Sequence, residues 1–388
     1  MNTNELIEAE DKYFINTFAR QPIVLDHGKG VKVWDKDGNE YIDMFAGIAV
    51  NALGHAHPKL VNALQGQVEK LIHVSNIYYN EPAIEYAKKL LPLTEFDRLF
   101  YANSGAEANE GAIKLALKYT GKSEIITAKD SFHGRTLLTL AATGHEEYRE
   151  PYLKNIPQGF IEVPYNDIEA IKEAISDETA AIMLEPIQGE GGVNVPSKKY
   201  FDEIAEICAE KDILLILDEV QTGFGRCGTL FAHELFDIKA DIMTIAKGVG
   251  GGVPMGAFLA TEKVAGGFVP GDHGTTFGGG PLVCAAANAV LDTILDEDLL
   301  ENSKKVGAYF KDKLNELKEK HDKIVDVRGH GLMIGVELSE SGAGYVDKLR
   351  EMGFLINCTA GNVLRFVPPL IITNEEIDKF VEALDKAL

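Results

Sequence analysis

The stretch Ile213-Leu214-Leu215-Ile216-Leu217-Asp218-Glu219 places five consecutive aliphatic residues directly before two carboxylates. An aliphatic run without polar alternation is typical of a parallel strand that is covered on both faces. Similar runs recur on either side of this stretch and alternate with segments of helical periodicity. The runs are LFYA (99–102), EIITA (124–128), AAIML (180–184), IMTIA (242–246) and GAFLA (256–260), and helices are expected at 104–119, 167–175 and 197–211. This order predicts a doubly wound α/β domain with a mostly parallel central sheet.

The remainder of the chain predicts a smaller α+β domain at the C-terminal end. Near the N-terminus, residues 30–34 and 40–44 flank an Asp37-Gly38 turn and are expected to form a hairpin. We expect residues 1–50 to pack with the small domain, 51–280 to form the large domain and 281–388 to form the small one. The elements expected in the last segment are helices at 281–296, 300–319, 343–352 and 374–386, and strands at 324–328, 331–338, 353–358 and 363–367.

Composition excludes several classes of partner. The chain has 388 residues with 38 Lys and Arg against 60 Asp and Glu, a net charge of −22, so neither nucleic acid nor an anionic membrane suits its surface. Its apolar stretches reach only about half the length of a bilayer crossing, and no signal peptide is visible at the N-terminus. The four cysteines lie far apart without C-x-x-C pairing, which indicates free thiols. These features predict a cytoplasmic location.

The sequence Asn103-Ser104-Gly105-Ala106-Glu107 follows the run LFYA and opens an expected helix. Ser104 and Glu107 have the spacing of a capping box, so one interpretation is a well-formed helix start. The other is a phosphate site, because small residues expose backbone N–H groups at the positive end of the helix dipole, at the carboxyl edge of a sheet. The local sequence is compatible with both.

Asp218 and Glu219 end the strand that opens this section. Burying a carboxylate is costly unless it is paired, so a buried Asp218 requires a cation, such as a protonated pyridine nitrogen. The alternative is that one acid caps the following loop while the other faces solvent.

Lys247 closes the run IMTIA and precedes four glycines within five positions. Glycine backbone allows a ligand to approach closely, and desolvation would lower the pKa of Lys247 and make it a Schiff-base nucleophile. A solvated surface lysine is the alternative.

The segment Ser131-Phe132-His133-Gly134-Arg135 offers an aromatic ring for stacking on a planar ligand and a guanidinium for a carboxylate. The alternative is a core Phe132 with a surface Arg135.

Other motifs are weaker. Gly223 to Gly228 match G-x-G-x-x-G, but DEVQT separates them from the strand, where a dinucleotide fingerprint begins at the strand end. His55 and His57 lack an acidic or cysteine cluster, so packing and hydrogen bonding are their expected roles.

The four main signals call for the same ligand. A helix N-terminus for phosphate, an aspartate for a ring nitrogen, an aromatic side chain for stacking and a lysine for an aldehyde together describe pyridoxal 5'-phosphate.

The sequence resembles the class III pyridoxal-phosphate aminotransferases of fold type I, and within them the acetylornithine aminotransferase subfamily. The similarity extends over nearly the whole chain. It is carried by FAGIAVNALGHAHP (45–58), SNIYYNEPA (75–83), NSGAEANEGAIK (103–114), FHGRT (132–136), EPIQGEGG (185–192), DEVQTGFGR (218–226), IAKGVGGGVPMGA (245–257), GDHGTTFGGG (271–280) and LINCTAGNVLRFVPPL (355–370).

The resemblance implies a role for each matching residue. Lys247 would bind the cofactor covalently and carry the proton, and Asp218 would keep the pyridine nitrogen protonated. Cofactor contacts are implied for Ser104, Gly105 and Ala106 at the phosphate, Phe132 and Val220 at the two ring faces, Gln221 at the ring hydroxyl, and Thr276 reaching the phosphate from the other subunit of a homodimer.

The implied substrates are acetylornithine and 2-oxoglutarate, with glutamate as a product. Arg135 would bind the α-carboxylate of acetylornithine, with Thr275 nearby from the other subunit. Glu190 and Arg365 would mask each other until Arg365 is needed for the α-carboxylate of glutamate or 2-oxoglutarate.

Two residues depart from the usual family pattern: Cys227 stands where threonine is common, and Gly280 where asparagine is common. Ornithine, 4-aminobutyrate, succinylornithine and succinyl-diaminopimelate stay open as substrates. Outside the family, a nicotinamide-dependent oxidoreductase and a non-catalytic binding protein are the alternatives.

Overall fold

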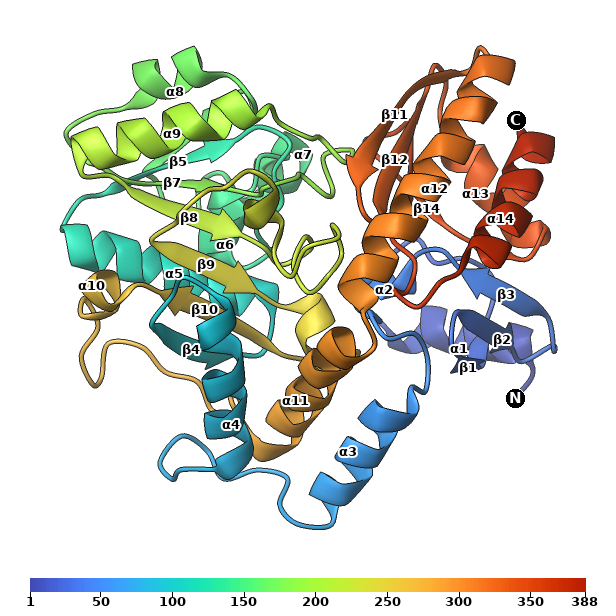
Figure 1. The fold of residues 1–388 in the computed structure, drawn as a ribbon, viewed down its shortest axis with the longest axis horizontal. Coiled ribbons are helices and arrows are strands. Elements are labelled where there is room, and N and C mark those ends of the chain that lie inside the picture. Colours follow the sequence, from blue (N-terminus) through green and yellow to red (C-terminus); the bar gives the residue numbers. More distant parts are fainter.

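The computed structural model describes all residues, 1–388, as a large α/β layer beside a smaller α+β part (Figure 1). The central sheet has seven strands in the order β4-β10-β9-β8-β7-β5-β6. Its strands are β4 (Arg98–Ala102), β5 (Glu124–Ala128), β6 (Phe160–Val163), β7 (Thr179–Leu184), β8 (Leu214–Asp218), β9 (Ile242–Ile245) and β10 (Gly256–Ala260).

The aliphatic strands are buried on both faces, as predicted, because helices cover both. Along β7, Ile182 and Leu184 pack in a core with Phe201 of α9 (Lys198–Lys211). The alternate residues Ala181 and Met183 pack in a separate core with residues of α5 (Gly105–Thr120). Two apolar faces on one strand explain why its sequence lacks polar alternation.

The structure corrects two details of this sheet. The run 256–260 forms β10, which is antiparallel to both β9 and β4. Only the short 3-10 helix η4 (Lys247–Gly250) lies between β9 and β10, too little chain for the helical crossover that a parallel return requires. The edge strand β6 escaped prediction because it is short and carries an exposed Glu162.

The large domain contains further helices around this sheet. They are α3 (Pro58–Val68), α4 (Glu81–Leu90), η1 (Leu91–Leu93), α6 (Leu137–Ala142), α7 (Glu146–Arg149), η2 (Glu150–Tyr152), α8 (Ile168–Ala174), η3 (Ala232–Leu235) and α10 (Glu262–Ala265). None of the helices combines the length and the apolar character that a bilayer crossing needs.

The small domain contains an antiparallel sheet in the order β11-β12-β15-β14. Its elements are α12 (Leu299–Lys320), β11 (Ile324–His330), β12 (Met333–Leu338), α13 (Ala343–Glu351), β14 (Asn357–Thr359), β15 (Val363–Phe366) and α14 (Asn374–Ala387). The single strand expected at 353–358 is wrong: it is divided between β14 and β13 (Phe354–Leu355), which belong to different sheets.

The N-terminal hairpin pairs with this part of the chain. It comprises β2 (Lys32–Asp35) and β3 (Glu40–Asp43), extended by β1 (Leu25–Lys29), and β13 adds to β3 in parallel. The helix α1 (Thr3–Tyr13) precedes it. The connection to the large domain passes through the turn α2 (Ala46–Ala49).

Helix α11 (Pro281–Asp296) has its most extensive contacts with α3 and α4 of the large domain. We therefore propose that the boundary between the domains lies between α11 and α12, rather than at residue 280.

Gly307 of α12 tests the packing of this helix on the small-domain sheet. A Cβ at Gly307 would lie 2.0 Å from the carbonyl oxygen of Gly331, a backbone atom that cannot rotate away. We expect Gly307→Ala to lower the free energy of unfolding by about 1–3 kcal/mol, as overpacking does. Urea unfolding of both proteins measures this difference in free energy. The matched control is Gly344→Ala in α13, where a Cβ meets nothing within 4 Å, and an equal loss in both variants would contradict the prediction.

Candidate active site

A cavity of about 470 Å³ lies at the carboxyl edge of the central sheet, where β4, β5, β8 and β9 end. Loops that are far apart in the sequence meet there, as expected for ligand sites in open α/β sheets. Nine of the predicted residues line it: Ser104, Gly105, Ala106, Phe132, Arg135, Asp218, Val220, Gln221 and Lys247.

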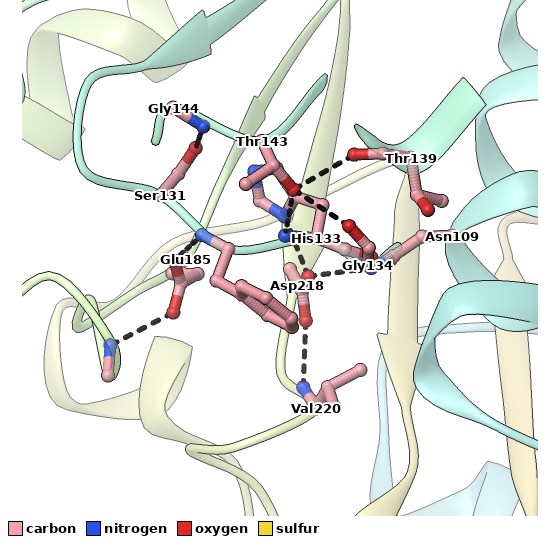
Figure 2. A network of polar contacts seen from close by, with 12 residues as sticks. Asn109, Ser131, His133, Gly134, Thr139, Thr143, Gly144, Glu185, Asp218 and Val220 are labelled. Atoms are coloured by element: carbon pink, nitrogen blue, oxygen red, sulfur yellow. Dashed lines mark hydrogen bonds and ion pairs between the residues drawn. The ribbon is translucent and has the colours of Figure 1, made fainter. Parts of the chain in front are cut away.

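Asp218 lies at the end of β8 and is 3 % exposed. Its Oδ2 accepts hydrogen bonds from Nδ2 of Asn109 at 2.8 Å and from Nδ1 of His133 at 2.7 Å, and its Oδ1 accepts one from the N–H of Val220 at 3.0 Å (Figure 2). Because the carboxylate can only accept, Nδ1 of the His133 ring is the donor in this contact. These donors orient the carboxylate, and no lysine or arginine forms an ion pair with it, so Asp218 is suited to a cationic ligand atom.

Sequence reasoning assigned no role to Asn109 or His133. Both are buried, on α5 and on the loop after β5, and they approach Asp218 only because these elements meet at one sheet edge. The position of His133 beside Phe132 was the only available signal.

Glu219 is also buried, but it points away from the cavity. Its carboxylate accepts hydrogen bonds from Thr222, from the N–H groups of Ala232 and His233, and from the His233 ring. It therefore shapes the loop after β8, and neither acid of the pair faces solvent.

The first turn of α5 faces the cavity beside this loop. Ser104 accepts a hydrogen bond from the N–H of Glu107, whereas the Glu107 carboxylate bonds to Asn103, so the reciprocal capping box is not formed. N–H groups at a helix start have no partner within their own helix and can bind an anion. A Cβ at Gly105 would lie 2.8 Å from a methyl group of Val220, so glycine lets the two loops approach closely.

Lys247 follows β9 and begins η4 with a left-handed φ of 48°. A non-glycine residue in this region is under backbone strain, which is often found at functional sites. Burial lowers the pKa of Lys247, although nearby carboxylates such as Glu190 oppose the effect. Its amine makes no hydrogen bond or ion pair in the structure, so it is free to act as a nucleophile.

Arg365 comes from β15 of the small domain and is fully buried. Its Nη1 lies 2.7 Å from Oε1 of Glu190 and donates to Oε1 of Gln221 at 2.9 Å. Gln221 Nε2 donates to the same Glu190 oxygen at 3.2 Å, which closes a triangle of contacts. Burial alone would raise the pKa of Glu190, but Arg365 and Lys247 outweigh it and lower that pKa to about 2. Glu190 is therefore ionised, and it pairs with Arg365.

Arg135 is exposed at the cavity and forms no ion pair. Its guanidinium carbon lies 3.4 Å from the centre of the Tyr148 ring and 5.8 Å from that of Phe132. Sequence reasoning missed Tyr148, which follows Arg135 by thirteen residues and holds it by a cation–π contact.

A left-handed turn in α2 shapes another wall of the cavity. Ala46, Gly47, Ile48 and Ala49 all have positive φ, from 50° to 65°. The Asp43 carboxylate accepts the N–H groups of Phe45 and Ala46 and so stabilises the start of this turn. It leads into Val50, which lines the cavity and which sequence reasoning missed.

Thr275 and Thr276 do not line the cavity of their own chain. Thr275 accepts a hydrogen bond from Asn103 at 3.1 Å, and Thr276 is exposed. The two histidines of H-A-H have the expected polar partners: His55 lies 2.8 Å from Asp43, and His57 lies 3.5 Å from Glu297.

The glycines of GFGRCG face protein side chains rather than a ligand. A Cβ at Gly225 would meet Leu370 and Leu300, and one at Gly228 would meet Lys304. The chain then enters the short η3 instead of a helix that could receive a pyrophosphate. The oxidoreductase interpretation therefore lacks its site. The unusual Cys227 is buried, with its sulfur 4.0 Å from that of Met333.

The family model described as "Aminotransferase class-III" matches residues 15–388. The chain belongs to this family. An acetylornithine aminotransferase of Methanothermobacter thermautotrophicus is 57 % identical to this class-III aminotransferase, covering 99 % of the chain and 98 % of that protein. An acetylornithine aminotransferase of Methanocaldococcus jannaschii is 52 % identical, with 100 % of this chain and 98 % of that protein covered.

Solved structures agree with the fold. The ornithine aminotransferase of Toxoplasma gondii has a TM-score of 0.96 at 34 % identity, with 100 % of this chain and 95 % of that one covered. The acetylornithine aminotransferase of Elizabethkingia anophelis has a TM-score of 0.89 at 37 % identity, with 100 % and 99 % covered. The predicted fold class is confirmed.

The cofactor of this class-III aminotransferase is pyridoxal 5'-phosphate, and the cavity fits it. The start of α5 offers N–H groups to a phosphate, Asp218 lacks a cation of its own, and Lys247 carries a free, desolvated amine.

Glu185 gives a pH-dependent test of this site. It accepts the N–H groups of Phe132 and Gly189, and burial, partly offset by His133, raises its pKa to about 7. The folded protein therefore holds a proton that the unfolded chain releases near pH 4.5, so the contribution of this group to stability is lost as pH rises from about 4.5 to 7. We expect Glu185→Gln to flatten the pH dependence of unfolding in that window, measured by urea titration. Glu319→Gln at an exposed position is the control, and unchanged slopes in Glu185→Gln would contradict the assignment.

Proposed function

We propose that this class-III aminotransferase transfers the δ-amino group of N-acetylornithine to 2-oxoglutarate, forming N-acetylglutamate 5-semialdehyde and glutamate, a step of arginine biosynthesis. The names of its relatives support acetylornithine as the amino donor. The observation that carries the proposal is the presence of two arginines in different states. Arg135 is free at the cavity, whereas Arg365 is paired with Glu190.

The two arginines would serve the two substrates in turn. Arg135 binds the α-carboxylate of acetylornithine, so that the distal amine lies at Lys247, while the Glu190 pair masks Arg365. For glutamate, whose α-amine must react, Arg365 is released and binds the α-carboxylate. A guanidinium suits this role because it pairs with carboxylates in a bidentate manner.

When bound, pyridoxal phosphate supplies an aldehyde for the substrate amine and a ring that withdraws electrons from the carbon that loses its proton. Lys247 is the base that removes this proton and returns it. Asp218 keeps the proton on the pyridine nitrogen, and His133 and Asn109 hold Asp218 in place. Ser104, Gly105 and Ala106 would hold the phosphate, Phe132 and Val220 would enclose the ring, and Gln221 would bind its hydroxyl.

We further propose a homodimer in which Thr275 and Thr276 complete the active site of a second copy. Asn76 donates hydrogen bonds to the carbonyl groups of Thr275 and Gly278, so the segments 76–79 and 275–278 lie together. They expose Ile77, Tyr78, Tyr79 and Phe277 by 63 to 97 %. Such a cluster favours a protein partner. We also propose a cytoplasmic location, which suits four unpaired cysteines.

A substrate comparison tests the reaction. With 2-oxoglutarate as acceptor, kcat/KM should be at least about tenfold higher for N-acetylornithine than for ornithine, 4-aminobutyrate or succinyl-diaminopimelate, the discrimination typical of one or two pocket contacts. Lys247→Ala should be inactive, and Lys239→Ala on the surface should not. A higher value for another amine would replace the proposed substrate, and absence of glutamate formation with every amine would reject the proposal.

Arg365→Ala tests the exchange of arginines. Loss of a charge-assisted contact costs about 1.5–3 kcal/mol, so the 2-oxoglutarate half-reaction should slow by roughly 10- to 100-fold. The acetylornithine half-reaction should change by only about twofold, because Arg135 is intact. Single-turnover absorbance measures each. The double variant Arg365→Ala/Glu190→Gln, which removes the stranded carboxylate, must show the same asymmetry, and equal losses in both half-reactions would count against the proposal.

A further inference from the structure

Arg226, in the loop after β8, is a buried arginine without a carboxylate partner. It is 2 % exposed and forms no ion pair. Burial lowers its pKa to about 10, so it stays charged at neutral pH. Its Nε and Nη2 have no hydrogen-bond partner in the structure. The Asp43 carboxylate favours the charged form but does not bond to it. A buried charge without a hydrogen-bonded carboxylate is costly, which indicates that this guanidinium is retained for something other than stability.

The hydrogen bonds of Arg226 join the large domain to the small one. Its Nη1 donates to the carbonyl of Leu332 at 3.0 Å and to that of Pro368 at 2.5 Å. In return, its carbonyl accepts the N–H of Leu332 at 2.9 Å and the hydroxyl of Ser303 at 3.2 Å. Leu332 lies between β11 and β12, Ser303 on α12 and Pro368 just after β15.

Two positions on the same loop thus contact β15 or its continuation. Gln221 bonds the side chain of Arg365 in this strand, and Arg226 bonds the backbone three residues beyond it. Neither the Arg226 side chain nor its backbone lines the active-site cavity. The strand that carries Arg365 is therefore the connection between Arg226 and the site.

Loss of the Arg226 contact would have different effects on Arg135 and on Arg365, the two arginines of the site. Lys247, Asp218 and Arg135 all lie at the end of a strand of the central sheet or on the loop that follows it, and none of them depends on the small-domain segments that Arg226 bonds for its place in the chain. Arg365 alone is delivered by the small domain. Loosening the contact at Arg226 would thus move Arg365 relative to the cofactor loop and leave Arg135 unaffected.

We propose that Arg226 is a positioning residue that sets the place of Arg365 and thereby the affinity for the dicarboxylate substrate, without serving the ω-amine substrate. This inference rests on the proposed function, because it takes Arg365 as the site of the 2-oxoglutarate α-carboxylate.

The test compares Arg226→Met, which keeps an unbranched apolar stem but removes the guanidinium and its donors, with Arg226→Lys, which keeps the charge and one donor nitrogen. Ser303→Ala is the control, since it removes a hydrogen bond to the Arg226 backbone but leaves the guanidinium contacts intact. The probes are glutarate, titrated into the holoenzyme by its visible absorbance, and single-turnover rates of each half-reaction.

For Arg226→Met we expect the glutarate Kd and the KM for 2-oxoglutarate to rise by roughly tenfold, the effect of about one hydrogen bond. The ω-amine half-reaction should stay within about twofold. Arg226→Lys should recover part of the loss, and Ser303→Ala should match wild type. Equal losses in both half-reactions, or an unchanged glutarate Kd, would overturn the proposal. If Arg226→Met does not fold, Arg226→Lys decides by the same two measurements.

Arg365→Ala separates this inference from the proposed function. If it weakens glutarate binding while Arg226→Met does not, only the role of Arg226 fails. If it leaves glutarate binding unchanged, the assignment of Arg365 fails, and the proposal for Arg226 fails with it. Whichever ω-amine the enzyme prefers can serve in the half-reaction assay.

Discussion

The buried carboxylate of Asp218 is the constraint on which the site depends. It lies at the end of a strand covered on both faces, where an uncompensated charge is expensive. Asn109, His133 and the Val220 N–H donate hydrogen bonds that orient it, and no lysine or arginine forms an ion pair with it. A ligand with a protonated ring nitrogen resolves this, and the surrounding groups supply the remaining contacts for such a ligand. The preference for pyridoxal phosphate thus follows from one unpaired charge and the elements that converge on it.

Electrostatics inside the cavity differ from those of the molecule as a whole. The net charge of −22 is that of the whole chain, and it limits the partners that the outer surface can bind. Around the cavity, Lys247, Arg135 and Arg365 and the positive end of α5 favour anions. Glu190 pairs with Arg365, so Arg135 is the free guanidinium of the site. A net acidic enzyme can therefore bind phosphate and dicarboxylates, because these interactions act over short distances in a partly desolvated pocket.

The connection between the domains gives the small domain its part in the chemistry. Arg365 reaches the large-domain loop from β15, and Thr359 and Arg328 bond the backbone of the segment that carries Glu190. The pair of Glu190 and Arg365 therefore spans both domains. The geometry of this pair depends on the contacts between the two domains, and the hydrogen bonds of Arg226 to Leu332 and Pro368 are among these contacts.

The sequence by itself predicted most of the strands, the long helices α5, α9, α11, α12 and α14, and nine residues that line the cavity, because these depend on local patterns. It did not predict α3, α4 or α6. Aliphatic runs report burial on both faces, and polar residues at strand ends must meet at one sheet edge. It did not reveal that β10 runs antiparallel or that residues 353–358 divide between two sheets, since strand direction and pairing depend on contacts distant in sequence.

Only the tertiary structure brought Asn109 and His133 to Asp218, Tyr148 to Arg135 and Arg226 to Pro368. None of these pairs has a sequence pattern, since each joins side chains from separate elements whose spacing along the chain carries no periodic signal. Local physics sets what each segment is, and the packing of the segments decides which charges meet.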